Sequence, residues 1–201
     1  MSDEMNVLIA GVGGQGALTL AGVLADAAMK SGINIIAGEV HGMAQRGGSV
    51  FVHVRMGPKV RGPIIPIGNA DVIVSLELVE ALRYLGFLAK ESAIVVSTTK
   101  TTPPLVWAGM AKYPSKDDIV NEYKKKSDSV YLIDSLDIAN QTGNSLTANI
   151  VLLGALVAVT KLPFKKDVIL ESLASVLPPK IVEVNKSAFE LGWQEAAKGN
   201  I

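Results

Sequence analysis

The residues whose types and spacing most clearly suit ligand binding form a glycine-rich loop near the start of the 201-residue chain. Gly11, Gly13 and Gly16 fit the spacing G-x-G-x-x-G, and Gly14 and Gln15 lie between them. Such glycines allow a tight turn and a close ligand approach, and a helix that begins there offers free N–H groups to a phosphate. The loop therefore predicts a nucleotide or phosphate site. The alternative is a tight strand–helix turn without a ligand, in which the Gln15 amide caps the loop instead of contacting a bound molecule.

A second polar segment, residues 39–49, holds an acid, an imidazole, a guanidinium, an amide, a hydroxyl and three glycines. We expect it to follow a parallel strand, at the sheet edge where α/β proteins bind ligands. His41 is a candidate proton shuttle, and Arg46 is a candidate clamp for a carboxylate or phosphate. Alternatively, Glu39 pairs with Arg46 and His41 bonds to the backbone. The binding candidates in this segment are Glu39, Gly47, Gly48 and Ser49.

Other ionisable side chains give weaker signals. The sequence shows no nucleophile with a base and an orienting residue at recognisable spacing, and no paired-carboxylate site. Glu77 and Glu80 fall three residues apart on a predicted helix, where we expect solvent to surround them. His53 is expected on a sheet surface. We therefore assign no catalytic residue beyond the candidates His41 and Arg46, and no metal site.

The predicted elements follow the strand–loop–helix–strand order of a parallel sheet. Residues 6–10 and 33–36 read as buried strands, with a helix over 17–29 between them. Residues 49–56 alternate like a strand, and 60–65 are expected to return as its hairpin partner. Further strands are predicted at 71–75, 93–97 and 129–133. One further helix is expected to begin after Ser115, and the others are predicted at 77–88, 136–142, 147–159, 167–176 and 186–198. The expected fold is a three-layer α/β/α domain over 1–201, with a mainly parallel Rossmann-like sheet and a β-hairpin insertion.

Composition narrows the partners. Apolar residues make up 49% and charged residues 19%, and 19 basic side chains balance 19 acidic ones, so neither nucleic acid nor membrane is expected as a partner. The chain has no cysteine, which removes thiolate zinc sites and cysteine-ligated iron–sulfur clusters. The acidic start lacks the basic region of a signal peptide, and the longest apolar run is shorter than the roughly 20 residues of a membrane span. We expect a cytoplasmic protein.

The glycine loop after an N-terminal strand resembles the gamma domain of the 2-oxoacid:ferredoxin oxidoreductases. The run Glu39-Val-His-Gly-Met-Ala-Gln-Arg-Gly-Gly-Ser49 makes the likeness more specific. It is similar to the beta subunits of indolepyruvate ferredoxin oxidoreductases rather than to the gamma subunits for pyruvate or 2-oxoglutarate. Residues 80–85, Asn149 with Leu153-Gly154, and residues 183–185 also match, so the resemblance covers essentially the whole chain.

The resemblance implies a holoenzyme that oxidatively decarboxylates an arylpyruvate, forms an acyl-CoA and passes two electrons to ferredoxin. It implies that thiamine diphosphate, magnesium and the iron–sulfur clusters belong to a larger alpha subunit, with CoA as cosubstrate. The sequence agrees with this assignment of the cofactors, since it contains neither cysteine nor a Gly-Asp-Gly motif followed by an Asn pair. This chain would then complete the active site as a non-redox subunit, inactive alone. The alternatives are a free-standing NAD(P)-binding Rossmann oxidoreductase and a purely structural interaction subunit.

Overall fold

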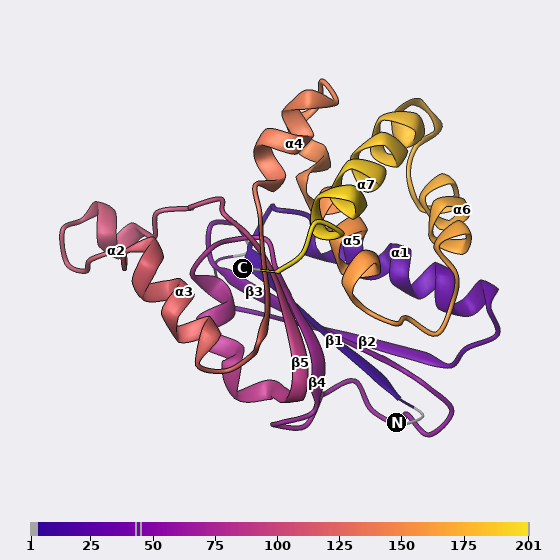
Figure 1. Cartoon of the computed structure of the whole chain (residues 1–201), viewed down its shortest axis with the longest axis horizontal. Coiled ribbons are helices and arrows are strands. Elements are labelled where there is room, and N and C mark those ends of the chain that lie inside the picture. Colours follow the sequence, from indigo (N-terminus) through magenta and orange to yellow (C-terminus); the bar gives the residue numbers. More distant parts are fainter. Residues whose placement is uncertain (1–3, 43, 45, 201) are drawn as a thin grey trace.

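The computed structural model describes residues 4–42, 44 and 46–200, and it alternates strands with helices along most of the chain (Figure 1). Residues Met43 and Gln45 of the second polar segment lie outside the described residues. In chain order the elements are β1 (Met5–Val12), α1 (Ala17–Lys30), β2 (Ile35–His41), β3 (Ser49–Met56), β4 (Ala70–Ser75), η1 (Glu80–Phe87), β5 (Leu88–Ser97), α2 (Pro104–Trp107), α3 (Lys116–Lys124), β6 (Ser129–Ile133), α4 (Ser135–Gln141), η2 (Ser145–Thr147), α5 (Ala148–Val159), α6 (Lys166–Val176), η3 (Pro179–Ile181) and α7 (Val182–Ala196).

The strands form one six-stranded sheet in the order β2-β3-β1-β4-β5-β6. β1, β4, β5 and β6 run parallel, whereas β3 is antiparallel to both of its neighbours, β1 and β2. The carboxyl ends of β1, β2, β4, β5 and β6 therefore share one edge of the sheet with the start of β3. The loops that follow these strands gather there, which is the edge at which open α/β sheets bind ligands.

Two details of the predicted sheet are wrong. The hairpin partner of β3 is β2 and not residues 60–65, which form no strand. Pro63 lies inside this stretch and Pro58 and Pro66 lie just outside it, and proline cannot donate to a strand ladder. The strand predicted at 33–36 spans Ile35–His41, and it is a half-exposed edge strand because β3 lies between it and β1. The α/β class, the mainly parallel sheet and the helices on both of its faces are confirmed, and the hairpin is formed by β2 and β3.

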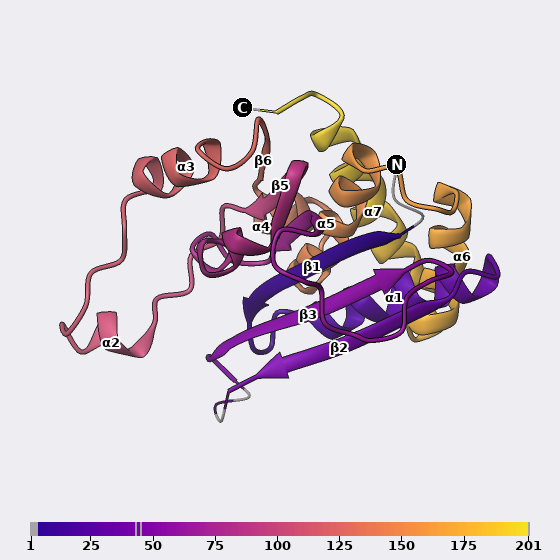
Figure 2. The ribbon, with the colours of Figure 1, turned by 90° about the horizontal axis from the view of Figure 1, so that it is seen from below.

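Helices cover both faces of the sheet (Figures 1 and 2). α1, α5, α6 and α7 cover one face, and η1 and α3 cover the other, so β1 is buried from both sides. α5 is apolar nearly all round and is buried over most of its length, as its sequence predicts. At Gly154 of α5 and Gly192 of α7 the two helices approach so closely that an added Cβ would lie within 2.0 Å of a backbone oxygen. The two helices therefore pack backbone to backbone at these glycines.

Candidate functional site

The glycine loop connects β1 to α1 at the carboxyl edge of the sheet. Gly16 caps α1 with a left-handed backbone (φ 87°), and its carbonyl accepts a hydrogen bond from the Leu20 N–H at 3.1 Å. No side chain caps the helix, and its first turn carries no acid. Backbone N–H groups at this end are thus available to an anion, and the helix dipole favours negative charge there.

Two backbone hydrogen bonds tie the glycine loop to the second polar segment. The Gly13 N–H donates to the Gly48 carbonyl at 2.8 Å, and the Gly47 N–H donates to the Gly13 carbonyl at 3.2 Å. The pairing of Val12 with Ser49 at the ends of β1 and β3 sets this register. Segments 34 to 37 positions apart in the sequence are therefore joined into one surface.

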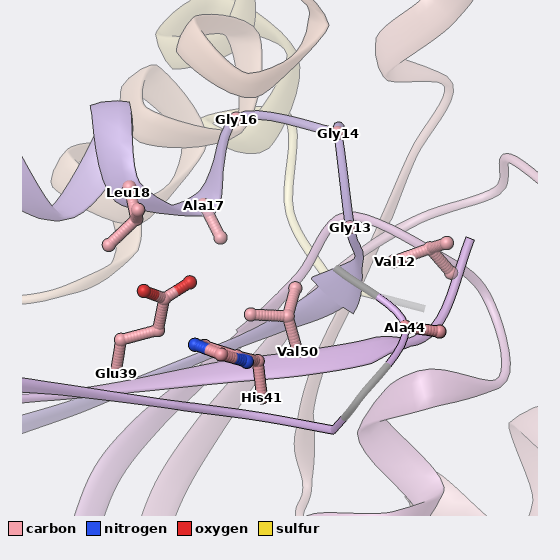
Figure 3. Close-up of a pocket in the computed structure, with 10 residues that line it drawn as sticks. All are labelled: Val12, Gly13, Gly14, Gly16, Ala17, Leu18, Glu39, His41, Ala44 and Val50. Carbon is pink, nitrogen blue, oxygen red and sulfur yellow. The ribbon is translucent and has the colours of Figure 1, made fainter. Parts of the chain in front are cut away.

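A cavity of ≈ 480 Å³ lies between these segments (Figure 3). The Glu39 carboxylate points toward the start of α1, and the His41 ring lies on the same side of β2 (Figure 3). His41 Nδ1 lies 3.0 Å from the Gly42 carbonyl oxygen. A carbonyl only accepts, so Nδ1 carries the proton and Nε2 is left to face a ligand. The cavity is lined by Val12, Gly13, Gly14, Gly16, Ala17, Leu18, Glu39, His41, Ala44 and Val50.

Several predicted site residues do not line this cavity. Arg46 is exposed, and no ion pair joins it to Glu39 within the described residues, so that structural alternative is not seen. Gln15 Oε1 accepts from the Val12 N–H at 2.8 Å, which means that its amide caps the loop. Gly11 lies in β1, where an added Cβ would be 3.0 Å from Gln15 Oε1. Ser49 faces away from the cavity and donates to Glu80.

Two carboxylates that were expected in solvent are instead buried beside the glycine loop. Glu77 is 0% exposed and Glu80 is 3% exposed, just after β4. Glu77 accepts hydrogen bonds from the N–H groups of Val79, Glu80 and Thr101 and from the Tyr113 hydroxyl. This donor set compensates the charge that burial removes from water. The signal in the sequence was an acid placed between Leu76 and Leu78, directly after a buried strand.

Burial and nearby polar groups change the ionisation or the surroundings of three aromatic side chains in this region, Tyr113, Tyr84 and His53. Burial and the hydrogen bond to the Glu77 carboxylate raise the pKa of Tyr113 far above its usual value of 10. The Tyr113 hydroxyl therefore stays protonated and donates to Glu77. Burial also raises the pKa of Tyr84, whose hydroxyl lies 3.1 Å from Ser49 Oγ. His53, expected on a sheet surface, is 2% exposed and lies edge-on to the rings of Phe51 and Phe87.

Chemically, the backbone N–H groups, Glu39 and His41 of this site can bind and orient a reactant. Across residues 4–42, 44 and 46–200 no three carboxylate or imidazole side chains are grouped to hold a metal ion. The absence of cysteine excludes cysteine-ligated iron–sulfur clusters from this chain. Within the same described ranges no helix has the length and apolar character of a membrane span.

Comparison with known proteins identifies the family. The sequence profile for the pyruvate ferredoxin/flavodoxin oxidoreductases matches residues 6–195. The chain belongs to this family. The chain is similar to the indolepyruvate oxidoreductase subunit IorB of Archaeoglobus fulgidus, 45% identical over 98% of this chain and 97% of that subunit, and to IorB of Pyrococcus horikoshii, 43% identical over 96% of each. In fold it is similar to the gamma subunit of a keto/oxoacid ferredoxin oxidoreductase from Geobacter sulfurreducens, with a TM-score of 0.70, 24% identity and coverage of 97% and 99% of the two chains.

Membership of the pyruvate ferredoxin/flavodoxin oxidoreductase family confirms the resemblance carried by the glycine loop and residues 39–49. The geometry also weighs against the free-standing dinucleotide-binding alternative. In the Rossmann order, the strand that carries the ribose-binding acid lies next to the glycine-loop strand. Here β3 lies between β2 and β1. Glu39 on β2 is therefore one strand spacing, about 4.8 Å, further from the glycine-loop strand than the acid of the Rossmann order.

Proposed function

We propose that this chain is the non-redox small subunit of an arylpyruvate, indolepyruvate-type 2-oxoacid:ferredoxin oxidoreductase. The observation that carries the proposal is similarity at 43–45% identity, over nearly the full length of both chains, to subunits named for indolepyruvate oxidoreductase. The proposed holoenzyme decarboxylates the 2-oxoacid, transfers the acyl group to CoA and passes the electrons to ferredoxin. Residues 1–201 act as one gamma-type domain of this cytoplasmic enzyme.

The side chains of this chain support a proposal about which subunit carries the cofactors. The chain has no cysteine and no Gly-Asp-Gly motif followed by an Asn pair, so its residues do not fit iron–sulfur clusters or thiamine diphosphate with magnesium. We assign these cofactors to a larger alpha subunit, and this chain meets ferredoxin only through the holoenzyme. Its own part is to bind, orient and enclose reactants at the carboxyl edge of its sheet.

Within that assembly, the cavity between α1 and β2 is proposed to receive an anionic group of CoA or of the oxoacid. The uncapped, acid-free start of α1 and the glycine-loop backbone supply donors for such a group. Glu39 and the free Nε2 of His41 border the same space and can bind hydroxyl or amide groups of the ligand. Arg46, exposed beside Gly47, is available to a partner or a substrate that approaches from outside.

Reconstitution tests the proposal directly. The chain is produced with and without its large subunit, and reduction of a viologen dye is followed with indolepyruvate, phenylpyruvate, pyruvate and 2-oxoglutarate in the presence of CoA. We expect a brown heteromer, active on the arylpyruvates, and no activity from the lone chain. A colourless lone chain that binds NAD or NADP tightly would support the free-standing oxidoreductase instead.

Two substitutions separate an active-site role from a purely structural one. Arg46→Ala and Gln15→Ala are introduced into the assembled enzyme, and KM and kcat are measured separately for the oxoacid and for CoA. A raised KM or lowered kcat in Arg46→Ala supports contact between this edge and the reactants, whereas the same change in Gln15→Ala alone reports the loss of the loop cap on the Val12 N–H. Unchanged kinetics in both variants would support the structural subunit.

A further inference from the structure

A short segment projects from the body of the protein at the same edge of the sheet. This α2 arm (residues 102–112) carries the helix Pro104–Trp107 and extends away from the packed layers in both views (Figures 1 and 2). The backbone hydrogen bonds of the helical turn stay within residues 103–111, for example from the Trp107 N–H to the Pro103 carbonyl at 3.2 Å. No residue of α2 is buried. The helix of the arm therefore buries no side chain completely against its own chain.

The arm exposes large apolar side chains. Leu105 is 59% exposed, Trp107 79% and Met110 77%. Single exposed apolar residues are ordinary on protein surfaces, but a group of three within six residues is typical of an interaction site. Tryptophan and methionine are enriched in protein interfaces, and tryptophan often dominates their binding energy.

Lysines border these apolar side chains along the sequence. Lys100 precedes the arm, Lys112 ends it and Lys116 follows it; all three are exposed, and the sequence has no acid between Glu91 and Asp117. The complementary surface is an apolar groove with carboxylates at its rim. Two copies of this chain that met arm to arm would bring like charges together, which disfavours a symmetric dimer through this element.

Both ends of the arm are held by one buried carboxylate. Glu77 Oε1 accepts from the Thr101 N–H at 3.0 Å on the entering side and from the Tyr113 hydroxyl at 2.6 Å on the leaving side. Thr101 also lies next to the glycine loop, since Gln15 Nε2 is 3.4 Å from its Oγ1. Pro103 and Pro104 stiffen the turn between these anchors. The arm is thus presented in a fixed position before it meets a partner, which reduces the entropy lost on binding.

We propose that the α2 arm is the docking element that inserts Trp107, Leu105 and Met110 into an apolar, acid-rimmed groove of the large subunit. The proposal rests on the proposed function, which requires such a partner. Because Thr101 bonds to Glu77 and lies next to Gln15 of the glycine loop, a large subunit seated on the arm would meet this chain beside the carboxyl edge of the sheet.

Binding measurements with matched variants test this proposal. The affinity of the full chain for its purified large subunit is measured by biolayer interferometry for Trp107→Ala and Leu105→Ala. Met29→Ala and Ile67→Ala serve as controls, since these side chains are 62% and 69% exposed on other parts of the surface. We expect Trp107→Ala to weaken binding about 30-fold, the loss typical of an interface hot spot, and the controls to bind like the unmodified chain. Unchanged affinity in both arm variants would overturn the proposal.

The anchoring role has its own variant. Tyr113→Phe removes one hydroxyl from Glu77 and leaves Trp107, Leu105 and Met110 in place. We expect faster hydrogen exchange of the arm amides in the free chain and binding roughly tenfold weaker, as for the loss of a hydrogen bond to a charged group. Binding and exchange equal to those of the unmodified chain would show that Glu77 does not order the arm.

The outcomes also separate this proposal from the proposed function. If the subunits assemble and the arm variants lose assembly, but arylpyruvates are not oxidised, the docking arm stands and the proposed substrate is wrong. If the enzyme is active and Trp107→Ala assembles normally, the docking arm alone is wrong. If the chain forms dimers that Trp107→Ala dissociates, the arm binds a second copy and the proposal fails. If no large subunit binds the unmodified chain, both proposals fail.

Discussion

Replacing Gly154 by alanine should loosen the packing of α5 on α7 and lower the stability of the whole domain. A Cβ at this position would lie 2.0 Å from the Phe189 carbonyl oxygen and 2.8 Å from the Trp193 backbone nitrogen. These atoms belong to the backbone of α7 and cannot rotate away. The helices would have to separate by about 1.3 Å to restore a carbon–oxygen contact of roughly 3.3 Å.

The cost follows from what that separation uncovers. The facing side chains of α5 and α7, such as Leu153 and Phe189, are fully buried, and interiors tolerate little expansion. We expect a loss of about 3 kcal/mol, the upper part of the range for overpacked cores, and for a chain of this length a fall in Tm of roughly 6–12 °C. Differential scanning calorimetry and urea unfolding measure both quantities.

The matched control is Gly22→Ala in the middle of α1. Its added Cβ would meet Val176 Cγ1 at 3.9 Å, an ordinary contact, and alanine favours the helix over glycine by about 1 kcal/mol. This variant should be as stable as the unmodified chain or slightly more stable. A Gly154→Ala protein that unfolds at the same temperature as the Gly22→Ala protein would refute the close approach of α5 and α7.

Three further perturbations test the groups around the site. Gly16→Ala should destabilise the chain by about 1–2 kcal/mol because of its left-handed backbone (φ 87°), and by more because the new Cβ would lie 2.5 Å from Asn149 Nδ2. Gly14→Ala, at a residue with φ 103° and open space around it, should show only the backbone cost, and urea unfolding of the two variants compares them. Glu77→Gln should cost about 3 kcal/mol, because an amide offers one acceptor oxygen where four donors converge, and an unchanged urea midpoint would contradict the buried network. Burial, and secondarily the Arg55 guanidinium, lowers the pKa of His53 below its usual 6.5. The His53 imidazole is therefore neutral in both the folded and the unfolded chain above pH 6.5, and just below that pH only the unfolded chain takes up the proton. The free energy of unfolding should fall as the pH drops below 6.5, and His53→Phe should remove that part of the pH dependence.

Local signals predicted most elements of this fold. The strand Ser129–Ile133 was found at its observed bounds, and Ser115 caps α3 by accepting the Asp118 N–H at 3.1 Å, as its position before two acids suggests. The errors concern pairing. An apolar run such as residues 33–36 shows that a strand is near, but only the long-range partner decides whether the strand lies inside the sheet or at its edge. The insertion of β3 between β2 and β1 depends on contacts that no local pattern contains.

For the candidate site too, the sequence predicts some features and not others. Backbone geometry could be predicted, because a glycine loop before a helix and a glycine-rich segment after a strand must meet at the carboxyl edge of the sheet. Side-chain partners could not. Gln15 turns back onto the Val12 N–H, and Ser49 turns to Glu80 on the opposite face of β3, so neither side chain lines the cavity.

Glu77 and Glu80 show why such partners escape sequence reasoning and how variants at this edge should be understood. Their partners come from far along the chain: Thr101 and Tyr113 lie 24 and 36 positions from Glu77, and Ser49 lies 31 positions from Glu80. Through these bonds Glu77 fixes the base of the α2 arm and Glu80 fixes the start of β3, on either side of the glycine loop. Neither carboxylate lines the cavity, so each positions the segments around it without touching a reactant. A loss of turnover in Glu77→Gln should therefore come with lost stability and assembly, whereas Arg46→Ala should change KM or kcat in a normally assembled enzyme.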